Sequence, residues 1–294
     1  SPISIILLVL AVVAIVVPPI TARIVEQSGF QAVYVSGGAT ANAVFGLPDI
    51  ELVDRGEIVA HAARIASSVR IPVLSDADTG YGNPLAVRRT VQEFERAGIA
   101  AIHIEDQASP KRCGHLAGKE VIPAEEMAAK IRAAVEARRG EDFVVIARTD
   151  ARAVEGLEAA IRRGRLYREA GADVLFPEAL ESEAEFRRFA QEVDGPLLAN
   201  MTEFGRTPYL EASRFAELGY KLVIYPVTSL RVAAKAVREA MRHLYSEGTQ
   251  RGFVDAMLTR EELYDIVDYP GWNLLAQAYA VEPGNAEGRA GRTH

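Results

Sequence analysis

The sequence lacks several features that mark large classes of protein. Its 294 residues include one cysteine, Cys113, which excludes an internal disulfide and a zinc site built from cysteines and suits a reducing cytoplasm. Acidic residues outnumber basic ones by 40 to 33, whereas a nucleic-acid surface needs clustered lysine and arginine. The net charge of -7 therefore argues against nucleic acid as a partner, but it allows a small anionic substrate held by a few local cations.

Nucleotide-binding signatures and repeats are also missing. No GxGxxG or GxxxxGK[ST] motif occurs, and no low-complexity tract or repeat of solenoid length is present. With 49% hydrophobic and 25% charged residues, the chain has the composition of a globular protein with a large core. We expect a single domain over residues 1–281 and a disordered tail over residues 282–294, which contain glycine and arginine.

No run of the sequence is long enough to read clearly as a membrane span. Residues 3–17 carry no charge, but a spanning helix needs roughly 20 apolar residues and a secretory signal needs a positive start. Residues 1–20 therefore form an atypical apolar leader, whose end fits a buried strand over residues 14–17. A membrane anchor or a signal peptide is the less favoured alternative.

The remaining sequence alternates short apolar runs with longer helical patterns. Strands are predicted at residues 14–17, 32–35, 71–74, 101–104, 143–147, 173–176, 197–199 and 222–225, and clear helical patterns occur at residues 86–97, 123–138, 157–170 and 229–245. Short β-branched runs between helices indicate parallel strands buried on both faces. Eight such units predict a (β/α)8 barrel of the α/β class, with an open doubly wound sheet as the alternative.

The third of these runs ends in two closely spaced carboxylates, Asp76 and Asp78, followed by Gly80 and Gly82. Side chains two positions apart on a strand point to the same face, so the two carboxylates repel unless a cation lies between them. A hard divalent ion such as Mg²⁺ is the simplest candidate. The alternative is a strand-ending turn in which aspartate and glycine serve only the backbone.

Polar side chains follow most of the other predicted strands. In a barrel the active site lies at the carboxyl ends of the strands, so these side chains are expected to share one site. They are Ser36, Asp76, Asp78, Glu105, Asp106, Arg148, Glu178, Asn200, Thr202 and Tyr225. Asp76, Asp78 and Glu105 would form its metal-binding side, and Arg148 its anion-binding side.

The longest loop, residues 107–119, follows the fourth predicted strand, and its glycines Gly114 and Gly118 would let it move as a lid. Cys113 lies among basic residues, so we expect a lowered thiol pKa that suits it to acid or base chemistry. A small apolar filler is the alternative for this cysteine. His115 is either a structural loop histidine or a participant in the reaction.

Six segments resemble the isocitrate lyase/phosphoenolpyruvate mutase superfamily, in the order that the superfamily has them. They are YVSGGATANAVFGLPD (34–49), SDADTGYGN (75–83), HIEDQASPKRCGH (103–115), ARTDA (147–151), FPEA (176–179) and LANMTEFGRTP (198–208). The resemblance covers residues 21–280 and is nearest to the 2-methylisocitrate and 2,3-dimethylmalate lyases. Residues 17–20, VPPI, depart from the superfamily's usual turn at this point.

The resemblance implies a barrel whose last helix is swapped with a neighbouring copy, in a homotetramer built from two such dimers. It also implies Mg²⁺, with Mn²⁺ as a possible substitute, held closely by Asp78 and largely through waters by Asp76, Asp49 and Glu105. Substrate would be bound by Ser36, Gly37, Gly38, Gly114, Arg148, Glu178, Asn200 and Thr202.

The implied reaction cleaves a carbon–carbon bond of a 2-hydroxy acid of the 2-methylisocitrate type, giving pyruvate and a second carboxylate such as succinate. Arg148 would stabilise developing negative charge, Cys113 would protonate the carbanion, and Tyr34 is the candidate base, with an ordinary buried strand tyrosine as the alternative. The alternatives are cleavage of 2,3-dimethylmalate and phosphonomutase chemistry. A non-catalytic barrel that serves as a binding or assembly subunit, tethered to a membrane by residues 3–17, is a hypothesis of another class.

Overall fold

The computed structural model describes residues 11–15 and 18–280. The chain divides into two compact units, residues 1–239 and residues 240–294. The predicted tail over residues 282–294 and most of the apolar leader lie outside the described residues, and a single domain over residues 1–281 stays a prediction.

The first unit alternates strands with helices along the described chain. Its strands are β1 (Ala11–Ile15), β2 (Ala32–Val35), β3 (Val73–Asp76), β4 (Ala101–Glu105), β5 (Val144–Thr149), β6 (Val174–Pro177), β7 (Leu198–Asn200) and β8 (Leu222–Tyr225). Its helices are α2 (Pro19–Gln27), α3 (Gly37–Thr40), the π-helical η1 (Ala41–Phe45), α4 (Arg55–Ala66), α5 (Pro84–Arg96), α6 (Ala124–Ala137), α7 (Ala151–Glu155), α8 (Leu157–Glu169), α9 (Glu183–Glu192) and α10 (Ala212–Glu217), and α11 (Thr228–Glu247) continues past residue 239.

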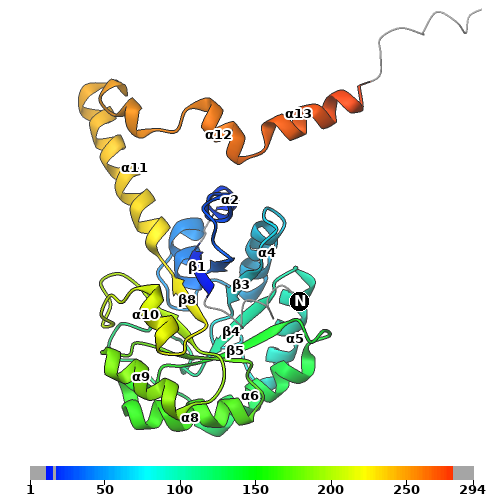
Figure 1. The fold of residues 1–294 in the computed structure, drawn as a ribbon, viewed down its shortest axis with the longest axis vertical. Helices are drawn as coiled ribbons and strands as arrows, with labels where there is room; N and C mark the ends of the chain where they lie inside the picture. Colours follow the sequence, from blue (N-terminus) through cyan, green and yellow to red (C-terminus); the bar gives the residue numbers. More distant parts are fainter. Residues whose placement is uncertain (1–10, 16–17, 281–294) are drawn as a thin grey trace, which may run out of the picture. The chain divides into compact units, whose positions relative to one another are not determined.

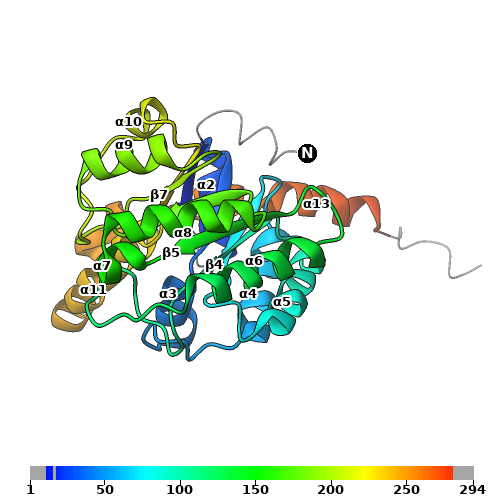
Figure 2. The same cartoon turned by 90° about the horizontal axis from the view of Figure 1, so that it is seen from below.

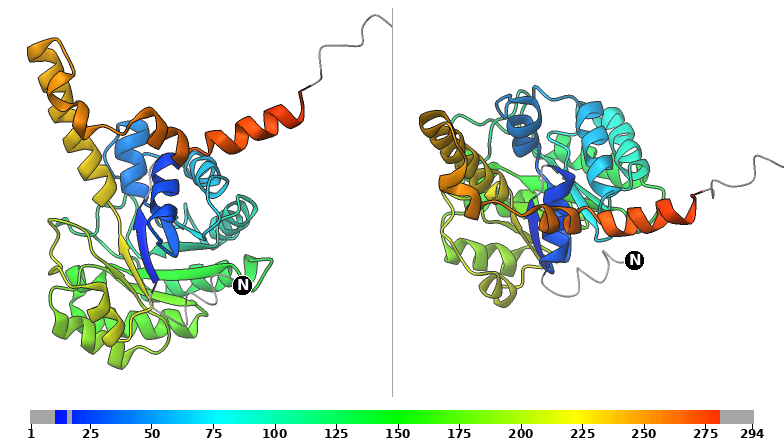
Figure 3. Two further views of the ribbon diagram at one scale, coloured as in Figure 1. Left: turned by 45° about the horizontal axis from the view of Figure 1, so that its top comes forward. Right: turned by 90° about the horizontal axis from the view of Figure 1, so that it is seen from above.

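The eight strands form one parallel sheet that closes on itself. Their order is β6-β5-β4-β3-β2-β1-β8-β7, and a parallel bridge from Leu175 to Leu197 joins the two ends. Figures 1 and 2 show helices α5, α6, α8 and α9 outside the strands, and Figure 3 gives two further views. The predicted (β/α)8 barrel is confirmed, and the alternative of an open doubly wound sheet is wrong.

Side chains along each strand alternate between the barrel interior and the helices. Tyr34 and Ile146, for example, belong to an inner apolar cluster, whereas their neighbours Val33 and Val145 pack in the outer cluster beneath the helices. The same alternation places Arg148 on the inner side of β5, two positions after Ile146. Strand polarity and alternation together thus decide which polar side chains meet inside the barrel at the carboxyl ends.

Local signals explain where several helices begin. Asp54 accepts from the Glu57 backbone N–H while Glu57 reaches back to the Asp54 backbone N–H, which is a capping box at the start of α4. At α5, Asn83 accepts from two backbone N–H groups, and the next residue, Pro84, has no N–H that needs a partner.

Six of the eight predicted strands differ from the structure at one end or both, and the first and third are displaced most. The first strand is Ala11–Ile15 instead of residues 14–17, because an uninterrupted apolar run carries no signal of where pairing begins. The third strand is Val73–Asp76 instead of residues 71–74, so Asp76 is its last residue and does not follow it. The strands at 32–35 and 222–225 are confirmed at both ends.

Among the helices that the structure describes, none combines the length and the apolar character that crossing a membrane requires. Most of residues 3–17, the proposed membrane anchor, lie outside the described part of the chain. Of this segment the structure describes only residues 11–15, which form a strand.

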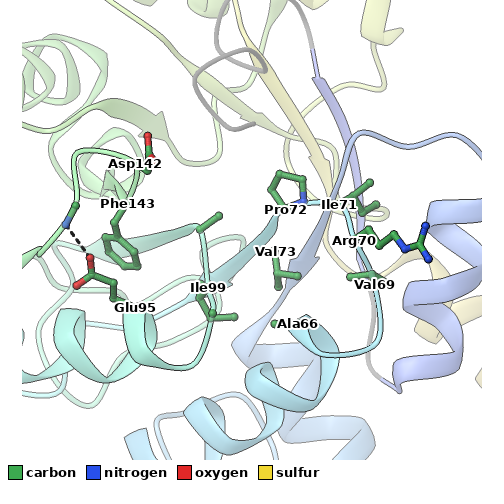
Figure 4. A pocket seen from close by; sticks show the side chains of 13 residues that line it. Ala66, Val69, Arg70, Ile71, Pro72, Val73, Glu95, Ile99, Asp142 and Phe143 are labelled. Carbon is green, nitrogen blue, oxygen red and sulfur yellow. Dashed lines mark hydrogen bonds between the residues drawn. The ribbon is translucent and has the colours of Figure 1, made fainter. Parts of the chain in front are cut away.

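A pocket of about 360 Å³ lies at the amino-terminal ends of the strands, opposite the end where the polar residues gather. Val73 opens β3, while Ile99 and Phe143 come just before β4 and β5 (Figure 4). Glu95 at its rim accepts hydrogen bonds from the backbone N–H groups of Arg139 and Gly140 at 3.0 Å, so this carboxylate serves the α6–β5 connection.

The second unit, taken by itself, contains the 3-10 helix η2 (Arg251–Ala256), α12 (Arg260–Ile266) and α13 (Tyr269–Ala278). A capping box between Thr259 and Glu262 starts α12, and the rings of Tyr264 and Tyr269 stack with centroids 4.7 Å apart. Helix α13 has no buried residue. An apolar helix with no buried face gains little stabilisation from packing.

We predict that Phe215→Ala destabilises the barrel by about 3–5 kcal/mol, because it leaves a cavity in a buried aromatic cluster. The Phe215 ring is fully buried and packs edge-on against Phe186 and Tyr220. The matched control, Phe204→Ala, removes a ring that is 88% exposed and should cost less than about 1 kcal/mol. Urea denaturation followed by circular dichroism measures both, and equal losses would contradict the prediction.

Candidate active site

The carboxyl ends of the strands enclose a cavity of about 330 Å³ that collects most of the predicted site residues. It is lined by Tyr34, Ser36, Gly38, Asp49, Asp76, Cys113, Gly114, His115, Arg148, Glu178, Asn200 and Thr202, among others. Three further predicted residues do not line the cavity themselves: Gly37, Asp78 and Glu105. Each of them contacts or adjoins a residue that lines it. Ile224 and Phe176 add apolar surface to the wall.

Arg148 is the buried cation of this site. Its guanidinium lies 2.9 Å from Asp150 Oδ2, 3.2 Å from Glu105 Oε2 and 3.6 Å from Glu178 Oε2, and 5.2 Å from the centre of the Phe176 ring. Although burial alone would lower the pKa of Arg148, the three carboxylates raise it well above its usual value. The side chain therefore stays charged and oriented, as a clamp for an anionic group must be.

The acidic side of the site is balanced by a lysine. Lys111 Nζ lies 2.5 Å from Asp49 Oδ1 and 2.8 Å from Asp78 Oδ1, and its side chain is buried. Burial raises the pKa of Asp78 to about 6, because Lys111 only partly offsets it and Asp76 and Asp49 add to it. The pKa of Asp76, by contrast, falls to about 2: burial would raise it, but His103, Lys111 and Arg148 together outweigh burial.

Two glycines let these carboxylates approach the backbone. A Cβ atom on Gly37 would lie 2.9 Å from Asp76 Oδ2, and one on Gly38 would lie 2.7 Å from Asp49 Oδ2. The Gly37 N–H donates to Asp76 Oδ2 at 3.1 Å. This N–H, expected to meet a substrate carboxylate, is thus engaged by a protein carboxylate here.

The residues fit a divalent ion that is bound mainly through water. Asp78 Oδ1 is buried and paired with Lys111 at 2.8 Å, and both carboxylate oxygens of Glu105 are buried, with Oε2 3.2 Å from Arg148. Burial raises the pKa of Glu105 well above its usual value. The ionised form of this carboxylate is therefore unfavourable here unless a cation compensates its charge. Within residues 11–15 and 18–280, however, no three histidine, cysteine or carboxylate side chains converge as a ready ligand cluster. One direct ligand assisted by waters is compatible with both observations.

Tyr34 has a partner that the sequence analysis did not assign. Its hydroxyl lies 2.7 Å from His103 Nε2, and His103 Nε2 lies 3.5 Å from Asp76 Oδ1. Burial, followed by the nearby charge of Asp76, raises the pKa of Tyr34 well above its usual value. Tyr34 is therefore a phenol at neutral pH, and it can act as a base only if its own proton moves on.

The loop that carries Cys113 is held on its first half by two side chains. Glu51 Oε2 accepts from Ser109 Oγ at 2.6 Å and from the Lys111 backbone N–H at 3.3 Å. The Gln107 side chain bonds to the backbone N–H and carbonyl of Arg112. The loop thus lies across the mouth of the barrel with Lys111 and Cys113 directed to the cavity that they line.

The expected lowering of the Cys113 pKa was wrong. Burial of the thiol raises its pKa, and the nearby carboxylates Asp49 and Glu178 add to this. The basic neighbours do not compensate, because the Lys111 ammonium is paired with Asp49 and Asp78. A raised pKa keeps the sulfur protonated at neutral pH, which suits a proton donor better than a nucleophile.

His115, Glu178 and Asn200 form the third side of the site. His115 Nε2 lies 2.7 Å from Glu178 Oε1, and its Nδ1 accepts from the Arg206 backbone N–H at 3.1 Å. Asn200 Nδ2 donates to both oxygens of Glu178, at 3.1 and 3.3 Å. Burial would raise the pKa of Glu178, but Arg148 and His115 lower it far below its usual range, so it remains a carboxylate.

Several polar residues at the site were not predicted from the sequence, among them His103, Lys111, Lys119 and Asp150. His103, Lys111 and Asp150 lie in the quoted motifs, and Lys119 ends the loop that carries Cys113. Strand alternation could have found His103, since it lies between the inward-facing Ala101 and Glu105. No local signal shows that a loop lysine such as Lys111 turns inward, because that depends on carboxylates distant in sequence.

Comparisons with known proteins agree with this geometry. The family model described as "Phosphoenolpyruvate phosphomutase" matches residues 13–245. The chain is 51% identical over 251 residues to a protein from Aeropyrum pernix named 2-methylisocitrate lyase, covering 85% of this chain and 80% of the relative.

Two solved structures extend the comparison. The crystal structure of a 2,3-dimethylmalate lyase, described as a PEP mutase/isocitrate lyase superfamily member, has a TM-score of 0.89 and 38% identity, covering 97% of this chain and 98% of its own. A phosphonopyruvate hydrolase in complex with oxalate and Mg²⁺ has a TM-score of 0.82 and 31% identity, covering 92% of this chain and 94% of its own.

We predict that His103 remains neutral throughout the physiological pH range, because burial lowers its pKa from about 6.5 to about 4. The unfolded chain takes up the proton below its normal pKa, whereas the folded chain does not. This residue therefore lowers stability as the pH falls from about 6.5 toward 4, and adds no pH dependence above 6.5. Nitrogen-15 NMR of the imidazole measures it, and a midpoint near 6.5 for His103 would contradict the prediction.

Proposed function

Because the chain belongs to the phosphoenolpyruvate phosphomutase family, within the isocitrate lyase/phosphoenolpyruvate mutase superfamily, we propose that it is a carbon–carbon lyase that cleaves 2-methylisocitrate to pyruvate and succinate. The observation that carries the proposal is the placement of a protonated thiol, Cys113, in the same cavity as the buried cation Arg148 and the acidic set. The relatives' names give the substrate class, and this arrangement supplies the groups that such a cleavage needs.

Mg²⁺ is the proposed cofactor, with Mn²⁺ as a possible substitute. Asp78 would bind it most closely, with Asp76, Asp49 and Glu105 acting largely through waters. The buried carboxylate oxygens of Asp78 and Glu105, of the ligand type that Mg²⁺ prefers, support this assignment, as does the Mg²⁺ in the related phosphonopyruvate hydrolase structure. When bound, the ion polarises the substrate hydroxyl and its neighbouring carboxylate.

Arg148 binds an anionic end of the substrate and stabilises the negative charge that develops as the bond breaks. Ser36, Gly38 and Gly114 contact substrate at the rim, where Gly114 has no side chain to collide with Arg148 and Glu178. Asn200 and Thr202, beside Glu178, complete the binding wall. The cavity thus offers positive charge and hydrogen-bond donors to a molecule with several carboxylates.

Three protons move in the proposed reaction. Tyr34 takes the proton of the substrate hydroxyl while its own proton passes to His103 Nε2, which lies 2.7 Å away. The electrons of the O–H bond form the carbonyl of pyruvate, and those of the broken carbon–carbon bond remain on the succinate carbon. Cys113 then donates its thiol proton to that carbon, and the closed loop with His115 beside Glu178 keeps water out.

Cleavage of 2,3-dimethylmalate is the nearest alternative, favoured by the structural match to a 2,3-dimethylmalate lyase. Phosphonomutase chemistry is a further alternative, because the family model carries that description. A non-catalytic barrel is disfavoured, since the acids, the arginine and the loop cysteine all meet at one cavity.

We expect purified protein with Mg²⁺ to release pyruvate from 2-methylisocitrate faster than from 2,3-dimethylmalate, measured by a coupled lactate dehydrogenase assay. Cys113→Ser should lower kcat by about a thousandfold or more, since general acid catalysis typically contributes 10²–10⁴-fold and serine is a far weaker acid. Equilibrium binding of oxalate to this variant should stay close to that of the wild type.

Ser213→Thr, a conservative change at an exposed serine of α10 outside the cavity, serves as the control with unchanged kcat. Release of no oxo acid from any 2-alkylmalate would contradict the lyase proposal. Full activity of Cys113→Ser would show that another group is the proton donor.

We also propose that the protein is a homotetramer built from helix-swapped dimers. A groove of about 450 Å³ in the first unit is lined by Pro19, Val44, Leu230 and Ala233, among others. The 240–280 segment of a second copy is the proposed occupant, because Trp272 and Leu274 on α13 are 64% and 67% exposed. Burial of these side chains would supply the stabilisation that an isolated apolar helix lacks.

Leu274→Asp should therefore reduce the sedimentation coefficient from that of a tetramer to that of a smaller species, because it places a charge in an apolar contact. The matched control is Leu85→Asp, at a leucine of α5 that is 75% exposed and outside the groove. Analytical ultracentrifugation measures both variants. A monomeric wild type, or a Leu274→Asp variant that remains tetrameric, would contradict this assembly.

The single cysteine supports a location in the reducing cytoplasm. The proposed partners are accordingly a small anionic 2-hydroxy acid and further copies of the same chain, without nucleic acid.

A further inference from the structure

Lys119, at the end of the Cys113 loop, is a buried lysine with no role in the reaction steps above. It is 7% exposed, and its ammonium contacts two groups: Asp150 Oδ1 at 2.6 Å and the carbonyl oxygen of Gly114, to which it donates a short hydrogen bond. A buried ammonium needs such partners because it has lost its hydration. One of these partners lies on the barrel, and the other is the loop residue next to Cys113.

Asp150 is shared between Lys119 and Arg148. Its Oδ2 accepts from Arg148 Nε at 2.9 Å, while Oδ1 is held by Lys119. The Asp150 backbone N–H donates to Asp106 Oδ1 at 2.8 Å, and Asp106 is held in turn by Thr149 and Tyr167. Asp150 is therefore a fixed point of the barrel, from which one oxygen orients Arg148 and the other binds the ammonium that holds the loop.

Gly114 presses the loop directly against Arg148. A Cβ atom at this position would lie 2.4 Å from Arg148 Nη2 and 2.6 Å from Glu178 Cγ, so the backbone here is in van der Waals contact with both side chains. The first half of the loop is fixed separately by Glu51 and Gln107. In the second half, the hydrogen bond from Lys119 to the Gly114 carbonyl holds the residue that immediately follows Cys113.

We propose that Lys119 is a positioning residue that couples the closed position of the Cys113 loop to the orientation of Arg148, through Asp150. When the loop is closed, one ammonium satisfies both the Gly114 carbonyl and Asp150. When the loop opens, Lys119 loses the Gly114 carbonyl, and its ammonium is no longer held between the loop and Asp150. The proton donor and the anion clamp are thus brought into place together.

This proposal rests on the proposed lyase function only for its kinetic part. The structural part can be tested by alkylation of Cys113 with iodoacetamide, which is specific because the chain has one cysteine. We expect Lys119→Met to raise the alkylation rate about tenfold or more, since a hydrogen bond to a charged group stabilises a closed conformation by at least that factor. Lys119→Arg, which keeps a cation with several donors, should stay within a few-fold of the wild type.

The matched control is Lys235→Met, the same substitution at an exposed lysine of α11 whose nearest carboxylate is 3.9 Å away. Its alkylation rate should equal that of the wild type. If Lys119→Met does not fold, Lys119→Gln gives the same comparison, because glutamine is shorter than lysine and carries no positive charge. A variant that is folded and alkylated at the wild-type rate would overturn the proposal.

The kinetic readout separates positioning from a purely structural role. Lys119→Met should lower kcat and raise KM together, because the loop and Arg148 are both released, and Lys119→Arg should restore both. A loss of thermal stability without faster alkylation would mean that Lys119 only stabilises the fold. If the protein cleaves none of the tested acids, the alkylation result still stands, so the two proposals fail separately.

Discussion

The site depends on one buried cation, Arg148, and on the three carboxylates that surround it. Asp150, Glu105 and Glu178 are each 1% exposed or less, and each would be a buried uncompensated charge without the guanidinium. Truncating one member of such a set leaves the remaining charges unpaired in the protein interior, where an unpaired charge is unfavourable. The arrangement therefore fixes the arginine more firmly than packing alone, and an anionic substrate meets a donor that is already oriented.

Closure of the barrel explains why these groups meet. The groups come from strands β4, β5 and β6 or the residues just after them, and parallel pairing brings the carboxyl ends together. Alternation then selects one face of each strand, so that Glu105 and Arg148 point inward while Ile104 and Ala147 pack under the helices. The opposite pocket, at the amino-terminal ends, is lined mainly by apolar residues, with Arg70, Glu95 and Asp142 among them.

The loop shows how tertiary contacts can reverse a local expectation. Positive neighbours in sequence would lower the pKa of Cys113, yet Lys111 is paired with Asp49 and Asp78, more than thirty residues away from it in the chain. Burial then dominates and raises the thiol pKa. The raised pKa keeps the sulfur protonated, so that it can donate a proton. The loop that carries Cys113 is hydrogen-bonded to Glu51 in its first half and to Lys119 in its second half.

The barrel, the family and most of the predicted site residues could be identified from the sequence by itself. The spacing of apolar residues, the direction of the strands and the spacing of the motifs are all local properties of the sequence. The sequence placed β2 and β8 correctly but misplaced β1, since a uniform apolar run has no boundary signal. Only the tertiary structure decided the partners of Lys111, Lys119 and His103 and the direction of the Cys113 pKa. These depend on burial and on charges brought together from distant strands, which no window of sequence contains.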